Sequence, residues 1–256
     1  MLDPHSEYFA TASRRLQAAA ADRDWDDHGE DPTDPESIHA MQIVLNIPKL
    51  NPPPQLALVA AAAEATVRLC LDDRAGFGFE PGDGSFAAAI DAWYQHRIRK
   101  VTRRARNAAW ERVQLVPGVT ATYEQAAARA IVPSAVYRVD PAVAKLQIGG
   151  TNVDDGDVDK RPSGCPHIYL DSGLAMSTGK LAAQAGHASM LLAAARPLDW
   201  VREWANGGFP LAVEMVDAQT FGQLREHADV VVVRDAGFTE VAAGSATAIA
   251  APQAIL

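Results

Sequence analysis

The chain reads HIYLDSGLAMSTGKLAAQAGHASMLLAAA at residues 167–195, and this stretch sets the pattern for the C-terminal part. HIYLD has the length and apolar character of a strand, and residues 178–196 are rich in helix-forming Ala, Leu and Met. The alternation continues downstream, where strands are expected at LAVEMVD, VVVVRDA and ATAIAAP and helices at DWVREWANG and AQTFGQLREHA. Strands that alternate with helices predict an α/β sheet covered by helices.

The N-terminal part repeats this order of elements. Strands are expected at MQIVLNI, RKVTRRA, VTATYE and ARAIVP, and helices at residues 54–72, 86–97 and 107–115. Each part places a Trp on its second helix, Trp93 and Trp204. We interpret the order as a diverged internal duplication that packs as an intrachain pseudo-dimer, so that a monomer would suffice. Chance agreement of a common α/β order is the alternative.

The predicted fold class is α/β, with two similar small three-layer units, each a mixed four-stranded sheet with helices on both faces. Residues 1–40 are expected to be a mobile acidic tail with one helix, because DRDWDDHGEDPTDPE cannot bury enough apolar surface to order itself. Residues 41–150 form the first unit. Residues 151–165, rich in Asp, Gly and Pro, form a linker, and residues 166–256 form the second domain.

Bulk composition narrows the class of protein. The 256 residues are 48% hydrophobic, which is ordinary for a globular protein, and the net charge of −9 argues against a general nucleic-acid coat. No apolar run reaches the roughly 18 residues that a membrane span needs, so no membrane partner is expected. The N-terminus lacks a signal-peptide pattern, and Cys70 and Cys165 match no metal spacing, which fits a cytoplasmic protein.

Three polar residues stand out on the helix at 178–196. Lys180, Gln184 and His187 recur at helical spacing, which places them on one face among small apolar residues. Lys180 lies in the first turn, beside free backbone N–H groups and the positive end of the helix dipole, where an anion could bind. The alternative is a solvated polar stripe on an amphipathic helix.

A second cluster follows the apolar strand VVVV. Asp235 comes at the end of this strand beside a glycine turn, a common active-site position in α/β folds. Thr239 follows four residues later, and Thr247 opens the last strand. An Asx turn that joins two strands is the alternative reading.

Together the two segments resemble the signature stretches of type II peptidyl-tRNA hydrolases. The first runs from Met176 through Gly179 and Lys180 to Ala188, and the second runs from Asp235 to Thr247. The resemblance covers residues 166–252 and implies a compact mixed sheet that hydrolyses the ester between a peptide and the 3′-terminal ribose of tRNA. It departs from the family in having no Lys on the strand after the second helix, and residues 41–150 carry neither signature.

The first unit contains a basic segment. Seven cations, with Trp93, Tyr94 and Trp110 close by, predict a phosphate-contacting patch. The alternative is a solvated face that pairs with the acidic residues 22–36, and such a tail would compete with tRNA. Lys100 also lies near the expected place of the family's strand Lys. The seven cations are Arg97, Arg99, Lys100, Arg103, Arg104, Arg106 and Arg112.

The resemblance implies the roles at the site. Lys180 is assigned to the oxyanion or the terminal phosphate and Asp235 to a base or water-orienting group, with His187 and Gln184 as further orienting groups. Thr239 and Thr247 would hold Asp235 or contact the 3′ end, beside Gly179. No nucleophile motif, metal-ligand spacing or cofactor motif occurs, so none is expected. A catalytically inactive tRNA- or nucleotide-binding module, or a hydrolase of another small ester or amide, remain alternatives.

Overall fold

The computed structural model describes residues 2–21, 30–31, 33–80, 82–155, 164–237 and 239–256, and it contains two mixed β-sheets. The sheet of the first unit has the order β2-β1-β4-β3, and the short β5 (Ser134–Ala135) pairs with the start of β1. The second sheet has the order β7-β6-β9-β8. The first sheet is built from β1 (His39–Asn46), β2 (Arg99–Ala105), β3 (Gly118–Tyr123) and β4 (Ala126–Ile131). The second is built from β6 (His167–Asp171), β7 (Ala212–Val216), β8 (Val231–Arg234) and β9 (Ala246–Ala251).

The two sheets share one topology. In each, the first strand lies inside the sheet, pairs in parallel with the second strand and pairs antiparallel with the last. The last strand then pairs antiparallel with the third, at the edge. The α/β class with two similar units is confirmed. The shared order agrees with an internal duplication but does not test common descent, which stays a prediction.

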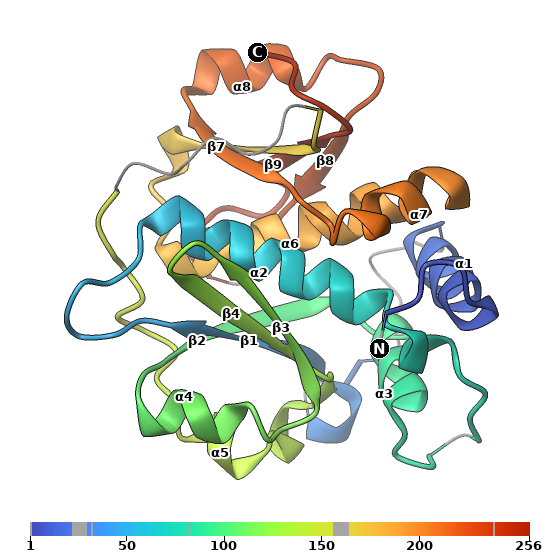
Figure 1. The fold of residues 1–256 in the computed structure, drawn as a ribbon. Coiled ribbons are helices and arrows are strands. Elements are labelled where there is room, and N and C mark those ends of the chain that lie inside the picture. The colour runs from blue at the N-terminus through green and yellow to red at the C-terminus, as the bar shows by residue number, and fades with distance from the viewer. Residues whose placement is uncertain (1, 22–29, 32, 81, 156–163, 238) are drawn as a thin grey trace.

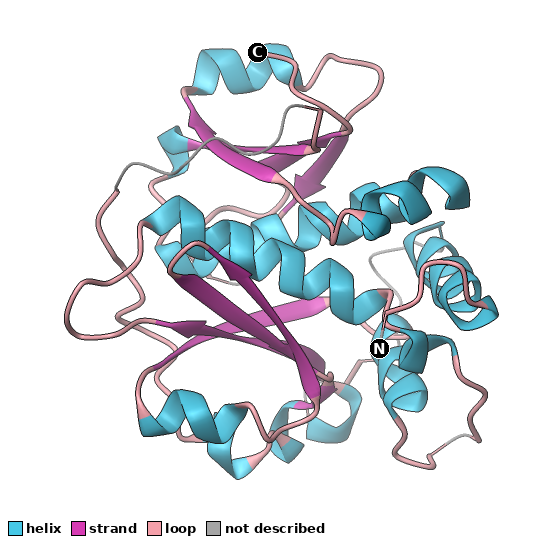
Figure 2. Ribbon diagram, viewed as in Figure 1, coloured by secondary structure: helices cyan, strands magenta, loops and turns pink. Residues whose placement is uncertain are grey.

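The sheets sandwich a shared layer of helices. In Figure 1, α2 (Gln55–Cys70) and α6 (Thr178–Ala194) lie between the two sheets, α8 (Ala218–Leu224) lies outside the second sheet, and α4 (Ala108–Val113) and α5 (Pro141–Ala144) lie outside the first. Figure 2 shows the same alternation of cyan helices and magenta strands through the molecule. Three further helices gather at one end: α1 (Glu7–Ala21), α3 (Phe86–Tyr94) and α7 (Leu198–Asn206).

Sequence explains why α2 and α6 take the central layer. A helix that is apolar on all sides must be buried on all sides, and both helices consist largely of Ala, Leu, Val, Gly and Met. Nearly every side chain from Ala57 to Val67 is buried, and so is nearly every one from Leu181 to Ala193. Each helix therefore packs on its partner and on a sheet, and most of the molecule shares one core.

Small residues let α2 and α6 approach closely. A Cβ atom added to Gly186 would lie 2.7 Å from Thr66 Oγ1, and Ser189 Oγ donates a hydrogen bond of 2.8 Å to the Ala63 carbonyl. When the helices are aligned so that residue 63 matches residue 186 and residue 66 matches residue 189, the contact between Gly186 and Thr66 corresponds to the contact between Ala63 and Ser189. A two-fold axis between the helices would relate the two contacts in this way. The same alignment pairs the first residues of the helices, and Gln55 Nε2 donates to Thr178 Oγ1 at 2.9 Å.

The expected mobile tail at residues 1–40 is corrected in part. The helix expected there is α1, and its Phe9 and Leu16 are buried in the shared core. Arg15 Nη1 donates to the Ala75 carbonyl at 2.6 Å, and Gln17 Nε2 donates to the Arg196 carbonyl at 3.1 Å. Apolar residues at helical spacing on α1 find a partner surface only in the folded chain. Deleting residues 1–40 would therefore remove core side chains together with the acidic run.

Two sequence expectations fall largely outside the described residues. They concern residues 22–29 and 32 of the acidic run and residues 156–163 of the linker. Within the described residues, no helix is long and apolar enough to cross a membrane.

We predict that Gly186→Ala lowers the free energy of unfolding by about 1–3 kcal/mol, because the added methyl group would meet the stiff, buried Thr66 side chain. The matched control is Gly222→Ala on α8, where an added Cβ finds open space, so improved helix propensity should stabilise the protein by about 0.5–1 kcal/mol. Urea denaturation measures both. Equal stabilisation by the two substitutions would show that the helices do not meet at Gly186.

Candidate active site

A lysine–aspartate ion pair lies where α6 begins and β8 ends. Lys180 is in the first turn of α6, and Asp235 directly follows β8. Lys180 Nζ donates a hydrogen bond to Asp235 Oδ2 and another, of 3.0 Å, to Thr239 Oγ1. The two charged side chains are only 11% and 8% exposed. Such a pair attracts more strongly than one on the open surface, because less water screens it.

Gln184 and Thr247 extend this pair into a chain of hydrogen bonds. Gln184 lies one turn further along α6 and donates from Nε2 to Asp235 Oδ2 at 2.8 Å. Its Oε1 accepts a hydrogen bond of 2.6 Å from Thr247 Oγ1, which is fully buried on β9. Thr247 therefore holds Asp235 through Gln184, and Thr239 holds Lys180. The other expectation for these two threonines, contact with the 3′ end of tRNA, stays a prediction.

The turn after β8 fixes the aspartate backbone. Gly237 donates its N–H to Asp235 Oδ1 at 2.8 Å, which closes the Asx turn that the sequence favours as an alternative. Asp235 also exchanges backbone hydrogen bonds with Ser245 and Gly244. Gly237 has φ +82, and a Cβ atom there would lie 2.6 Å from the Ala243 nitrogen. The Asx turn is therefore compatible with a functional role for Asp235, because the same turn presents its carboxylate to Lys180.

The expected anion site at the start of α6 is corrected. The backbone N–H groups in the first turn already have partners, because Thr178 donates to Asn152 Oδ1 at 3.1 Å and Gly179 donates to Thr151 Oγ1 at 3.0 Å. The N–H of Lys180 donates to the capping Ser177 Oγ at 3.2 Å. These N–H groups are therefore not open to a ligand.

Glu240 supplies an anion at this helix end and was not expected from the sequence. Its two carboxylate oxygens accept hydrogen bonds of 2.7 Å from the backbone N–H and the hydroxyl of Ser177. A carboxylate is favoured at the positive end of a helix dipole. Glu240 follows Thr239, so this contact ties the loop that carries Thr239 to the helix that carries Lys180. In the sequence, only the Ser-Thr-Gly-Lys start of the helix indicated that an acidic side chain could bind at this helix end.

Gly179 does not face the ion pair. Its carbonyl accepts a hydrogen bond of 2.8 Å from Thr102 Oγ1 on β2, and an added Cβ would lie 2.8 Å from Thr151 Oγ1. The assignment of Gly179 to substrate binding is corrected, because the absence of a side chain at this position lets Thr102 and Thr151 pack closely against α6. His187 is half-buried one turn after Gln184, and its role in orienting the substrate stays a prediction.

The basic segment does not form one patch. Arg99 donates two hydrogen bonds of 2.5 Å to the carboxylate of Glu30, and the backbone N–H of Arg97 donates to the same group at 2.8 Å. Burial by itself would raise the pKa of Glu30, but the hydrogen bonds from Arg99 and Arg97 outweigh it and the pKa lies below its usual value. The alternative of pairing with the acidic run is thus correct for these two arginines.

Strand alternation sends the other cations in different directions. Lys100 Nζ lies 3.2 Å from Met190 Sδ and 5.2 Å from the centre of the Trp93 ring, so it does not stand in for the missing strand Lys at the ion pair. Arg103 donates to Gln42 Oε1 at 2.7 Å and to the Leu146 carbonyl at 2.9 Å. Arg104 and Arg106 line a surface hollow of about 260 Å³ at the end of β2.

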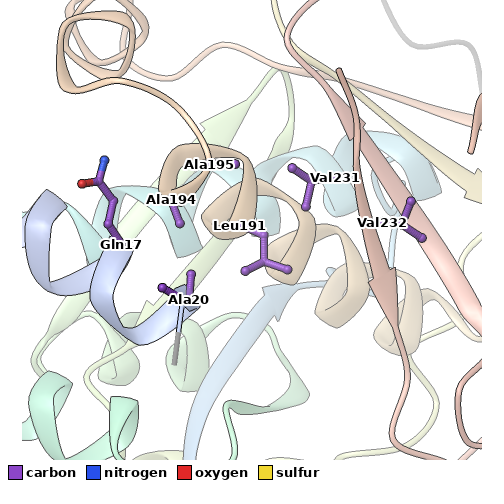
Figure 3. A pocket seen from close by; sticks show the side chains of 8 residues that line it. Gln17, Ala20, Leu191, Ala194, Ala195, Val231 and Val232 are labelled. Carbon is purple, nitrogen blue, oxygen red and sulfur yellow. The ribbon is translucent and has the colours of Figure 1, made fainter. Parts of the chain in front are cut away.

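A second hollow, of about 370 Å³, lies far along α6 from the ion pair. Figure 3 shows it between Gln17 and Ala20 of α1, Leu191 and Ala194 of α6, and Val231 and Val232 of β8. None of the described side chains that line it is charged. Across the described ranges, no three His, Cys, Asp or Glu side chains gather so that they could hold a metal ion.

The first unit lacks the parts of this site. In the helix alignment given above, Ala57 and Ala61 of α2 stand where α6 has Lys180 and Gln184, and both alanines are fully buried. Residues 235–245 join β8 to β9, but only residues 124–125 join β3 to β4. The shorter turn has no place for an equivalent of the Asp235 and Thr239 loop.

Comparison with known families finds a match to the C-terminal domain. The family model of peptidyl-tRNA hydrolase PTH2 matches residues 167–254. This confirms the resemblance for the C-terminal domain and supports a hydrolase in general, whereas a diverged copy of the domain in the first unit is not confirmed. A comparison of the chain with curated proteins finds no match. A comparison with solved structures finds none either.

We predict that Thr247→Val lowers the free energy of unfolding by about 1–3 kcal/mol, because it leaves the buried Gln184 Oε1 without its hydroxyl donor. Thr247→Ser keeps the donor and should cost less. Thermal and chemical denaturation of both variants measure the difference. No loss in Thr247→Val together with a loss in Thr247→Ser would mean that the methyl group of Thr247, not its hydroxyl, stabilises this region.

Proposed function

We propose that the protein hydrolyses the ester bond between a peptidyl, or N-blocked aminoacyl, group and the 3′-terminal ribose of tRNA. The observation that supports this proposal is the Lys180–Asp235 pair, which is braced by Gln184 and Thr239 within the segment that matches the peptidyl-tRNA hydrolase family. Such substrates arise from translation, so the proposed compartment is the cytoplasm.

The available hydrogen-bonding positions suit ester hydrolysis. An ammonium group has three N–H donors, and Lys180 uses two of them on Asp235 and Thr239. The third is available for the oxyanion that forms when water attacks the ester carbonyl. Asp235 Oδ1 accepts from Gly237 and has a further lone pair with which to orient that water.

The reaction then needs one water and no covalent intermediate. Water attacks the carbonyl carbon, and its proton passes to the Asp235 carboxylate as the C–O bond forms. Lys180 stabilises the oxyanion of the tetrahedral intermediate. When the intermediate collapses, the bond to the ribose oxygen breaks and the proton on Asp235 passes to that oxygen. The products are a carboxylic acid and a free 3′ end.

The remaining residues of the cluster act by positioning these two groups. Gln184 and Thr247 orient Asp235, and Thr239 orients Lys180. His187 shares a helix with Lys180 and Gln184 and remains our candidate for orienting the substrate.

Contact with tRNA falls to the cations without acidic partners. Arg97 and Arg99 are engaged by Glu30, and Lys100 and Arg103 face Met190 and backbone carbonyls. Arg104, Arg106 and Arg112 form no ion pair with a described residue, and of these Arg104 and Arg106 line one hollow. We therefore narrow the proposed tRNA contact from the whole basic segment to these two arginines.

We predict that Lys180→Ala and Asp235→Asn each lower the turnover of N-acetylated aminoacyl-tRNA by roughly 10²-fold or more, because each removes one group that acts in the transition state. The exposed Lys145 gives a control, and Lys145→Ala should keep the turnover unchanged. Release of the N-acetylated amino acid measures the rate, and circular dichroism verifies folding.

Wild-type rates in either folded variant would contradict the assigned roles. Absence of cleavage by the wild type, with tRNA still bound, would favour the alternative of a binding module that keeps the fold without turnover. The acidic balance of the C-terminal domain and the missing strand Lys are the features that motivate that alternative.

A further inference from the structure

The hollow at the end of β2 lies where the connections that follow two neighbouring strands leave on opposite faces of the sheet. After β1 the chain passes to α2 on the inner face of the first sheet, and after β2 it passes to α4 on the outer face. The carboxyl ends of β1 and β2 meet here because the two strands are parallel. Ligands of open α/β sheets bind in the crevice at such a switch point.

Three cations converge on this hollow. Lys49 reaches it from the segment after β1, and Arg104 and Arg106 reach it from β2 and the residue just beyond. None of the three forms an ion pair with a described residue. Asp154 is the one acidic side chain among the described residues that line the hollow, so the formal charge of this lining is positive.

The guanidinium of Arg104 is held rather than loose. Its Nε donates to Gln147 Oε1 at 2.8 Å. The group lies over Gly150, where an added Cβ would approach Arg104 Cζ to 3.3 Å. Gly150 has φ +66 and so supplies both the turn and the room for the side chain. A fixed planar guanidinium is suited to the oxygens of a phosphate, which it can bind through two hydrogen bonds.

The hollow and the ion pair flank the same helix end. Asn152 lines the hollow, and its Oδ1 accepts the N–H of Thr178. Thr178 lies two residues before Lys180, which is about 3 Å along a helix axis. Lys180 and the hollow are therefore connected through one helix turn and Asn152.

We infer that Lys49, Arg104 and Arg106 bind a backbone phosphate near the 3′ end of the tRNA, so that the first unit binds the nucleic acid and the second unit cleaves the ester. This inference rests on the proposed function. No aromatic side chain lines the described part of the hollow, so bases have no stacking surface there. The contact is therefore to the backbone, independent of base identity.

The test is tRNA affinity as a function of salt. Lys49→Glu/Arg106→Glu should weaken the binding of deacylated tRNA about tenfold or more near 0.1 M salt, and it should reduce the slope of log K against log salt by about 1–2. Asp154→Asn removes the negative charge and should tighten binding. The control is Arg14→Glu, an exposed residue on α1 at the other end of the molecule.

A loss of affinity in Arg14→Glu that is half as large, on a logarithmic scale, as the loss in the double variant would overturn the inference, because overall charge alone would then account for both effects. Unchanged tRNA affinity in the double variant would overturn it as well. If inorganic phosphate alone perturbs the NMR signals of Lys49 and Arg106 while tRNA affinity does not change, the hollow is a small-anion site and not a tRNA site.

A minimal substrate separates this inference from the proposed function. The N-acetylaminoacyl ester of adenosine carries the ribose ester but no phosphate, so the double variant should cleave it at the wild-type rate and lose activity only on tRNA. If the wild type cleaves neither substrate, the proposed hydrolysis fails, and the salt dependence of tRNA binding still decides the role of the hollow.

Discussion

The packing of α2 against α6 is the constraint on which the rest of the structure depends. Both helices are apolar over most of their surface, so neither could face water alone, and each completes the burial of the other. The close approach at Gly186 and Thr66 sets the distance between the two sheets, because each sheet rests on this one layer. The two units therefore share a core and do not meet only at a surface.

This shared layer also explains where polar chemistry can occur. The middle of α6 is closed by two sheets and α2, and only its first turns reach a boundary where charged groups have partners. Lys180 and Gln184 lie there, and the loop after β8 brings Asp235 to them. The same boundary receives Thr102, Thr151 and Asn152 from the other side. Residues of the first unit and residue 151 thus contact the start of α6, and the side chains of α6 contact Asp235 in the second unit.

Much of the fold follows from local sequence, because periodic apolar runs encode strands and helices directly. RKVTRRA and HIYLD form strands over the expected residues, and Lys180, Gln184, Asp235, Thr239 and Thr247 come together as two separated motifs suggest. The partners of α1 could not be foreseen, since Phe9 and Leu16 are buried only by elements distant in sequence. The hydrogen bonds by which Thr151 and Asn152 cap the start of α6 could not be foreseen either, since these residues are also distant in sequence from the helix. The seven cations do not form one patch, because neighbouring residues of a strand face opposite sides, as Arg99 and Lys100 do, and the strand expected at RKVTRRA already implies this alternation.

The tight turn between β3 and β4 has a consequence for stoichiometry. A pair of identical units would offer two equivalent reaction centres, and occupancy of one could influence the other. Among the described residues, the first unit has Ala57 and Ala61 on its helix and only a two-residue turn after its third strand, so the Lys180–Asp235 cluster has no counterpart there. If the proposed hydrolysis takes place at this cluster, the saturation curve of one chain is expected to be hyperbolic, with one equivalent of substrate bound per chain.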